Sequence, residues 1–431
     1  MSEANPSFKQ YIVKKSFLTT AWVSSTYFAE GLPYMLVRFM SSVFFTDMGV
    51  REALLGFLNF LGIPWNLKFL WAPFLDIFGT KRSWMLGTQF VITVLTFAIS
   101  AIAGFYSKGG PTSALYAVAF IFVGLAFVSA TNDVAIDAYY LEGLTERRDQ
   151  AAYSGLRVMA YRIAVIYARS VLVAVAGIAN WVWGFGVGAA TMLALLILHR
   201  AILPRFEAER EKKAVRIKEV AGQFIDSFSS YLRQERIVTV LIFVASYKLG
   251  DEILFSMNTP FLMRELGVTK TQLSLVAGVI GSVSAIGGAM LGAWWIKSAG
   301  LRRAIWPITL LMNVNIWAYV LLAWVKPSAA TAKGLALIAA VHGYENIAAG
   351  LGTAALMIYL MRLCSQKYKA AHFAIGTAIM SLGATFIGGF SGIIVEKMGY
   401  VNLFILGFVA AIPSILLLFR IPLHEEDEKA Q

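Results

Sequence analysis

The sequence predicts an all-α membrane protein with about 12 transmembrane helices, arranged as two pseudo-symmetric six-helix bundles. The first observation behind this prediction is composition. Of 431 residues, 58% are hydrophobic and 14% are charged, whereas soluble domains are about 45–50% apolar and about 25% charged. The second is that apolar residues recur in runs of the roughly 20 residues that a membrane-spanning helix needs. The third is a loop motif that occurs once in each half of the chain.

The apolar runs give six expected spans in each half. In the first half they are residues 17–40, 53–75, 83–106, 112–139, 151–177 and 181–200. In the second half they are residues 237–262, 271–296, 302–325, 333–361, 370–394 and 399–420. Each run is long enough to cross a hydrocarbon core of about 30 Å, with some tilt allowed.

A polar segment separates the two halves. Residues 205–236, RFEAEREKKAVRIKEVAGQFIDSFSSYLRQER, mix both charge signs and keep apolar residues at helical spacing, which is typical of an amphipathic helix on a membrane surface. We therefore expect an N-terminal six-helix bundle at 1–200 and a cytosolic amphipathic linker at 201–236. A C-terminal six-helix bundle with a short cytosolic tail is expected at 237–431.

The distribution of lysine and arginine predicts that both termini are cytosolic, in a multi-pass protein of the cell inner (plasma) membrane. Basic residues gather in the loops on the expected cytosolic side, and few lie in the opposite loops. Cytosolic basic loops also explain the net charge of +12, so we expect no nucleic-acid partner. The polar N-terminal stretch MSEANPSFKQYIVKKSF lacks a signal-peptide pattern, so the first span is expected to be retained.

Several kinds of site are not expected from this sequence. The single cysteine, Cys364, cannot form an internal disulfide or a cysteine metal cluster, and the four histidines show no paired ligand spacing. A phosphate loop of the GxxxxGK[ST] type is also missing from the sequence. We therefore expect no cofactor, no metal, no catalytic residues and no activity that is driven by a bound nucleotide.

The loop motif is DIFGTKRSW at residues 76–84 and KSAGLRRAI at residues 297–305. Both copies follow the second span of a six-span half, and many secondary transporters are built from duplicated halves with a site at their interface. The pattern resembles the loop that marks the major facilitator superfamily. We expect a conformational gate at the cytosolic side, with these residues in it: Asp76, Lys81, Arg82 and Arg302.

Further stretches extend the resemblance along nearly the whole chain. They are GLP at 31–33, KFLWAPFLD at 68–76, NDVAIDAY at 132–139, YRIA at 161–164, YKLGD at 247–251 and ENIAAGLGTAALMIYLMRLC at 345–364. Together they resemble the AmpG-type muropeptide permeases and the related acetyl-coenzyme A transporters. The resemblance implies a major facilitator fold. For the AmpG branch it implies proton-driven import of anhydro-muropeptides, which are sugar–peptide fragments from peptidoglycan turnover.

Charged residues within the spans are candidate functional groups, because a charge at the bilayer centre costs about 2.5–3.5 kcal/mol on insertion scales. Asp133 and Asp137 lie one helical turn apart and share a face. They either pair with Arg157 and Arg162 and hold two spans together, or at least one of them carries a proton. Glu345 is either a hydrogen-bonded packing residue or a further proton site.

The remaining polar residues of the spans suggest substrate contacts. Lys248 and Asp251 are three residues apart and either pair with each other or face the cavity, and Lys68 either does the same or extends to the cytosolic surface. The expected substrate is an anionic sugar–peptide, which arginine can bind through two parallel hydrogen bonds. The candidate substrate-binding residues are Glu30, Tyr34, Lys68, Tyr161, Arg162, Arg157, Lys248, Asp251 and Asn346.

Two alternatives stay open. Within the transporter class, the substrate is acetyl-coenzyme A or another anionic metabolite. Outside it, the paired acids could serve a membrane-embedded acyl- or glycosyltransferase, but the duplicated plan and the lack of a sizeable extramembrane domain argue against an enzyme. The expected partners are the small-molecule substrate, protons and the lipid bilayer, and the chain is expected to act as a monomer.

Overall fold

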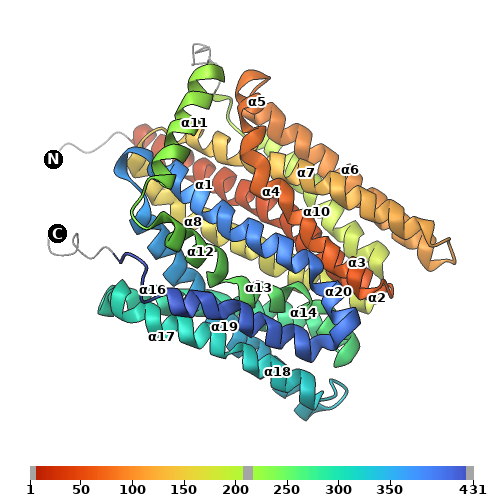
Figure 1. Ribbon diagram of the computed structural model, residues 1–431. Helices are drawn as coiled ribbons and strands as arrows, with labels where there is room; N and C mark the ends of the chain where they lie inside the picture. The colour runs from red at the N-terminus through yellow and green to blue at the C-terminus, as the bar shows by residue number, and fades with distance from the viewer. Residues whose placement is uncertain (1–5, 207–216, 424–431) are drawn as a thin grey trace. The chain divides into compact units, whose positions relative to one another are not determined.

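The computed structural model describes residues 6–206 and 217–423, and within these ranges every regular element is helical (Figure 1). Contacts divide the chain into two compact units. The first comprises Met1–Met40 and Leu67–Val215, and the second comprises Ser41–Asn66 and Arg216–Gln431. Residues 41–66 group with the second unit by their contacts, and the bundles expected at 1–200 and 237–431 stay predictions. Each unit is described by itself below.

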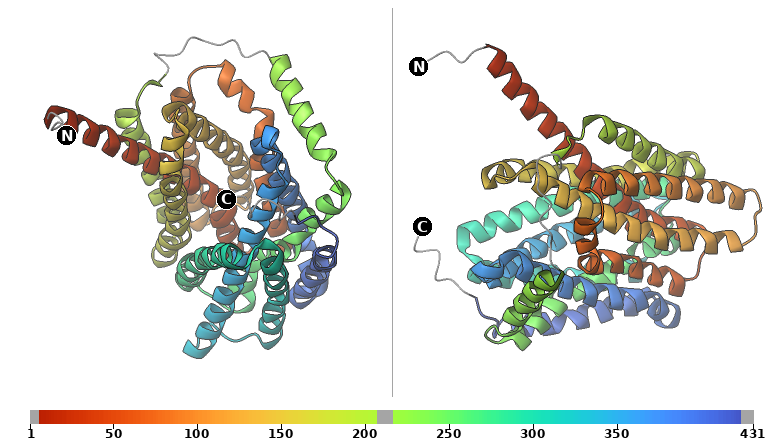
Figure 2. Two further views of the ribbon diagram at one scale, coloured as in Figure 1. Left: turned by 90° about the vertical axis from the view of Figure 1, so that its left-hand side faces the viewer. Right: turned by 90° about the horizontal axis from the view of Figure 1, so that it is seen from above.

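The first unit is built from long helices joined by short turns. Its elements are α1 (Pro6–Met35), the π-helical turn η1 (Leu36–Met40), the 3₁₀ turn η3 (Lys68–Leu70), α5 (Ala72–Ile77), α6 (Lys81–Ser107), α7 (Ser113–Gly143), α8 (Arg147–Ile166), η4 (Tyr167–Leu172), α9 (Val173–Ile178) and α10 (Trp181–Ile202). Helix α6 packs against both α7 and α10, as Figures 1 and 2 show. Buried hydrogen bonds join them, from Thr88 to Asn132 at 3.1 Å and between Gln89 and His199 at 2.8 Å.

The second unit begins with the short elements of residues 41–66 and continues after the linker. Its elements are α2 (Ser41–Asp47), α3 (Glu52–Phe57), η2 (Leu58–Gly62), α4 (Ile63–Leu67), α11 (Ile217–Leu232), α12 (Ile237–Tyr247), α13 (Leu249–Ser256), α14 (Asn258–Pro260), η6 (Phe261–Glu265), α15 (Lys270–Leu273), η7 (Ser274–Ile280), α16 (Gly281–Ala299), α17 (Leu301–Val314), α18 (Ile316–Val325), α19 (Ala332–Leu363), η8 (Gln366–Tyr368) and α20 (Lys369–Leu417). Of the expected linker helix, the described part is α11, and its place on a membrane surface stays a prediction.

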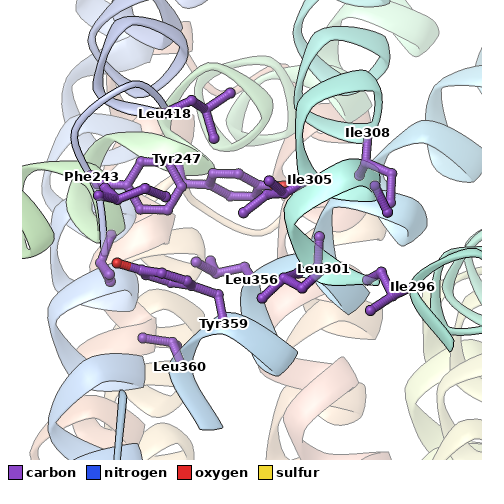
Figure 3. Close-up of a cluster of buried hydrophobic side chains, with 14 of the residues drawn as sticks. Phe243, Tyr247, Ile296, Leu301, Ile305, Ile308, Leu356, Tyr359, Leu360 and Leu418 are labelled. Atoms are coloured by element: carbon purple, nitrogen blue, oxygen red, sulfur yellow. The ribbon is translucent and has the colours of Figure 1, made fainter. Parts of the chain in front are cut away.

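A cluster of buried apolar side chains holds the second unit together (Figure 3). Phe243 and Tyr247 of α12 meet Tyr359 of α19, with the Phe243 and Tyr359 ring centroids 5.2 Å apart in an edge-to-face arrangement. Leu301 and Ile305 of α17 fill the other side of the cluster. Because lipid is as apolar as these side chains, close packing contributes more to holding such helices together than the hydrophobic effect does.

Nine helical stretches of the described chain are long and apolar enough to cross a membrane. Ala371–Leu417 is one of them, and it contains two of the expected spans, divided at Gly399, whose φ of +79° breaks the helix. The expected spans at 17–40 and 237–262 are helical in the structure but are not among the nine. The multi-pass helical plan is confirmed, and the count of twelve stays a prediction.

The duplicated loop motif has the same backbone geometry in both copies. Gly79 and Gly300 have φ values of +73° and +79°, a region that glycine adopts without steric cost. Each lies just before a long helix, α6 and α17 respectively. The conformation explains why glycine stands at the matching place in each half.

Candidate functional site

Three charged side chains of the first unit meet around α7. The Asp133 carboxylate is buried and its Oδ2 lies 2.5 Å from the Lys68 Nζ, which comes from η3. One turn further along α7, the Asp137 Oδ1 accepts a hydrogen bond of 2.8 Å from the Tyr27 hydroxyl of α1. The two aspartates therefore share a helical face, as the spacing predicts, but they bind different neighbours.

Arg157 of α8 completes the charge balance on the Asp137 side. Its Nη1 lies 3.9 Å from the Asp137 Oδ1. The guanidinium carbon lies 4.9 Å from the centroid of the Tyr27 ring and 5.4 Å from that of Tyr140. Such cation–π contacts compensate a partly desolvated arginine. Arg157 is thus held by two aromatic rings and a carboxylate.

Glu30 brings a third carboxyl group to the same place. It follows Tyr27 by three residues on α1, so the two side chains lie on one helical face. The Glu30 Oε2 is buried, and it has no hydrogen-bond partner among the described residues. We call Glu30, Lys68, Asp133, Asp137 and Arg157 the carboxylate cluster.

The carboxylate cluster contains three acids and two cations. One bound proton would make the cluster neutral, which is the cheaper state at membrane depth. The arrangement is therefore suited to binding a single proton.

The sequence left the partners of these aspartates open, and the structure identifies them. Arg157 approaches Asp137, as one interpretation expected, whereas the ion pair of Asp133 among the described side chains is with Lys68. Lys68 therefore faces the cluster. Arg162 is exposed on α8 and makes neither of these two ion pairs.

Two candidate substrate-binding tyrosines come together in the first unit. The Tyr34 ring of α1 and the Tyr161 ring of α8 have centroids 6.4 Å apart, inclined by 44°. Helices α1 and α8 approach closely here because Gly31 has no side chain. A Cβ at this position would lie 2.9 Å from the Tyr161 carbonyl oxygen. Close packing of α1 against α8 therefore explains why a glycine stands at Gly31 in the GLP stretch.

In the second unit, Lys248 and Asp251 form the expected internal pair. The Lys248 Nζ lies 3.2 Å from the Asp251 Oδ2 and donates a hydrogen bond of 3.1 Å to the Thr353 Oγ1 of α19. Both charged side chains are largely buried. The pair lies at the break between α12 and α13, where the helix is interrupted.

A second polar network of this unit surrounds Glu345 and Asn346. The Asn346 amide lies 3.2 Å from the Glu345 Oε2 and 3.3 Å from the His342 Nε2. The His342 Nδ1 lies 2.6 Å from the hydroxyl of Tyr319, which contacts Asn258 at 3.2 Å. We call these five residues, all of them buried, the histidine network.

His342 was not among the residues that the sequence singled out. A lone histidine in an apolar span carries little signal, but its position three and four residues before Glu345 and Asn346 puts all three on one helical face. Helix α16 approaches this face closely, since a Cβ on Gly281 would lie 2.7 Å from the His342 Nε2.

The expected gating residues bind helix ends within the first unit. The Lys81 Nζ donates to the Leu75 carbonyl at 2.6 Å, at the C-terminal end of α5. Arg82 donates to the carbonyls of Arg200 and Leu203 at the end of α10, at 2.9 and 3.2 Å. Cations at helix C-termini satisfy free carbonyls and the helix dipole.

The other two gating candidates are less fully described. Arg302 is exposed in the first turn of α17. The Asp76 backbone belongs to α5, and its side chain lies outside the described part of the structure. The gating role of all four residues stays a prediction.

Comparison with known proteins bears on the family and the fold of the chain. The family model for the Major Facilitator Superfamily matches residues 23–346. The chain is 27% identical over 399 residues to the anhydromuropeptide permease of Escherichia coli (strain K12), covering 91% of this chain and 77% of that protein. It is 26% identical over 402 residues to the putative transporter AmpG 4 of Rickettsia felis, covering 90% and 93% respectively.

Solved structures show the same fold at lower identity. A bacterial homologue of the human lysosomal transporter Spinster aligns with a TM-score of 0.66 at 14% identity, covering 97% of each chain. A D-xylose–proton symporter aligns with a TM-score of 0.66 at 13% identity, covering 94% of this chain and 98% of the other. Together with the family model, which matches about three quarters of the chain, these findings show that the chain belongs to the Major Facilitator Superfamily.

Proposed function

We propose that this transporter imports anhydro-muropeptides across the inner membrane together with protons, and that both its termini are cytosolic. The carboxylate cluster supports the proton part of the proposal. The substrate part is supported by the similarity to the E. coli anhydromuropeptide permease and by cations that suit an anionic ligand.

The carboxylate cluster is proposed as the proton site because its charges do not cancel. Among the described residues, Asp133 pairs with Lys68 and Asp137 pairs with Arg157, and Glu30 is the third acid of the cluster. A proton on Asp133 would weaken its attraction for Lys68. Protonation can thus change a contact between η3 and α7, which is what coupling of a proton to a movement requires.

The substrate site is proposed around the same cluster. Tyr34 and Tyr161 supply aromatic faces on which a sugar ring can pack, and Arg157 supplies a planar cation. In the second unit, Lys248, Asp251 and Asn346 are the matching candidates for contacts with peptide carboxylates and amides. Glu345 is proposed as a second proton site.

Uptake into sealed proteoliposomes tests this proposal. Purified protein should accumulate a radiolabelled anhydro-muropeptide when the lumen is made alkaline, and the label should be recovered chemically intact. Excess unlabelled muropeptide should compete, and excess acetyl-coenzyme A should not. If acetyl-coenzyme A competes and muropeptide does not, the substrate is acetyl-coenzyme A. A chemically altered label would indicate a transferase. Accumulation that is independent of the pH gradient would show that transport is not coupled to protons.

A further inference from the structure

The histidine network contains one side chain, that of Asn346, whose orientation is set by its neighbours. Asn346 follows Glu345 on α19, and only 4% of the residue is exposed. The side-chain amide has a nitrogen that donates hydrogen bonds and an oxygen that accepts them. Which of these two atoms points out of the network therefore decides what kind of group Asn346 can bind.

The nitrogen of this amide points into the protein. The Asn346 Nδ2 lies 2.8 Å from the backbone carbonyl oxygen of His342 and 3.2 Å from the Glu345 Oε2. A carbonyl oxygen only accepts hydrogen bonds, so the amide nitrogen and not the amide oxygen has to lie beside it. With the amide reversed, two oxygen atoms would face each other at this short distance. The hydrogen-bond partners thus assign the orientation of Asn346.

The same orientation fixes the proton on the His342 imidazole. The His342 Nε2 lies 3.3 Å from the Asn346 Nδ2. Because the Asn346 Nδ2 is a donor, the Nε2 accepts and carries no hydrogen. The proton of the neutral imidazole is then on Nδ1, which lies 2.6 Å from the Tyr319 hydroxyl. His342 therefore donates to Tyr319 on one side and accepts from Asn346 on the other.

The far end of this hydrogen-bond chain is anchored outside α19. Tyr319 belongs to α18, and its hydroxyl can donate to the Oδ1 of Asn258, which belongs to α14, at 3.4 Å. The Tyr319 ring also packs against the rings of Phe261 and Phe404, with centroids 6.0 and 5.6 Å away. Two other elements thus hold the imidazole of His342, and the imidazole can in turn hold Asn346.

Helix α16 closes the nitrogen side of the amide. A Cβ on Gly281 would lie 2.7 Å from the His342 Nε2 and 3.5 Å from the Asn346 Nδ2. The backbone of α16 therefore occupies the space beside both nitrogen atoms, and no room is left there for a group of a ligand.

The amide oxygen is the atom that remains available. Among the described residues no donor is bonded to the Asn346 Oδ1, and this atom is not completely enclosed by protein. The small exposed part of Asn346 therefore includes an unused acceptor. An acceptor that is already oriented costs less conformational entropy on binding than one that first has to be ordered.

We propose that Asn346 binds the transported substrate through its amide oxygen, which accepts a hydrogen bond from an N–H or O–H group, and that His342 is the residue that positions this amide. For an anhydro-muropeptide the donor is a peptide N–H or a sugar hydroxyl, and not a carboxylate. Only the identity of the substrate rests on the proposed function.

Transport kinetics of two His342 variants test the positioning role. His342→Leu removes the imidazole donor and acceptor, so the Asn346 amide can turn. The KM for an anhydro-muropeptide should then rise about tenfold, and the maximal rate should stay within about twofold of the wild type. His342→Gln again offers one acceptor and one donor, and it should bring KM back to within about threefold of the wild type. Rescue by glutamine but not by leucine distinguishes hydrogen bonding from packing.

A variant of Tyr319 reaches Asn346 only through His342. Tyr319→Phe keeps the ring but removes the hydroxyl that binds the His342 Nδ1, so KM should rise about threefold. In a His342→Leu background the same change should cause no further rise. The matched control is Tyr359→Phe, because the buried Tyr359 hydroxyl has no hydrogen-bond partner among the described residues, and its removal should leave KM unchanged.

Competition with the two parts of the substrate identifies the donor group. The sugar without its peptide and the peptide without its sugar each compete with labelled anhydro-muropeptide in proteoliposomes of the wild type and of His342→Leu. The part whose inhibition constant rises about tenfold in His342→Leu supplies the donor to Asn346. Inhibition constants that are the same in both proteins for both parts would reject the acceptor role.

The remaining outcomes are distinct. An equal rise in KM for His342→Leu and His342→Gln, or an unchanged KM for both at normal abundance and unfolding midpoint, would overturn the positioning by His342. A rise in KM for Tyr359→Phe would show general loosening of the second unit and would also reject it. Absence of uptake by the wild type would instead refute the proposed function, and the assignment of the Asn346 oxygen to that substrate would fall with it.

Discussion

The Lys68 Nζ lies 2.5 Å from the Asp133 Oδ2, and this ion pair joins the turn η3 to helix α7. Lys68 is the first residue of η3, and Asp133 lies in the carboxylate cluster. A proton that binds to Asp133 would remove the negative charge that attracts Lys68, and it would therefore weaken the contact between η3 and α7.

The first prediction concerns proton coupling. Asp133→Asn should lower uptake driven by a pH gradient by about 10- to 100-fold, because a charge-assisted hydrogen bond worth about 1.5–3 kcal/mol is lost from the proton site. Exchange of labelled for unlabelled substrate at equal pH should change much less. Both rates are measured in the same proteoliposomes.

The control for this prediction is Asp149→Asn, an identical change at an exposed position in the first turn of α8. It should leave both rates near those of the wild type. If Asp133→Asn lowers exchange as strongly as gradient-driven uptake, Asp133 holds the structure or the substrate and the proton role is wrong.

The second prediction concerns the stability of the Lys68–Asp133 pair. Lys68→Met leaves Asp133 buried without its cation and should lower stability by about 1–3 kcal/mol. Adding Asp133→Asn to the same chain should recover part of this loss, because the uncompensated charge is gone. The apparent unfolding midpoints of the wild type, the two single variants and the double variant are compared in detergent by tryptophan fluorescence. Additive losses in the double variant would show that the two residues do not interact.

The helices were predictable from the sequence, and most of these contacts were not. Apolar runs and the double Gly–x–basic–basic motif indicate spans and a duplicated plan, because both depend on neighbouring residues. The helical spacing of Asp133 and Asp137 fixes a shared face, but it does not select a partner. Lys68 is 65 residues away from Asp133, and only the packing of η3 against α7 brings them together.

The same reasoning explains what was missed in the second unit. His342 has no local signal apart from its spacing to Glu345, since its partners Tyr319 and Asn258 come from other elements. The attachment of residues 41–66 to α20 also depends on contacts between residues more than 300 positions apart. The periodicity of apolar residues cannot predict such contacts, because it describes the faces of one helix at a time.

The third prediction concerns the histidine network. Gly281→Ala places a Cβ 2.7 Å from the His342 Nε2, so the buried imidazole has to shift and stability should fall by about 1–3 kcal/mol. Gly287→Ala lies on the same helix with open space around it and should be neutral or slightly stabilising. The measurement is the thermal unfolding midpoint of both variants in the same detergent. Equal midpoints would mean that the His342 side chain can shift without a loss of stability.

The fourth prediction concerns the substrate anion. Arg157→Lys keeps the charge but loses the planar group that lies on Tyr27 and Tyr140 and can bind a carboxylate through two hydrogen bonds. The KM for an anhydro-muropeptide should rise about tenfold, which corresponds to one charge-assisted hydrogen bond. Protein abundance should stay close to normal.

Arg162→Lys is the matched comparison, because Arg162 also lies on α8 but is exposed and makes no ion pair with Asp137 in the structure. A rise in KM for Arg162→Lys alone would move the anion site to Arg162, where the YRIA motif of the sequence places a candidate. A fall in abundance with unchanged KM would make Arg157 a structural residue.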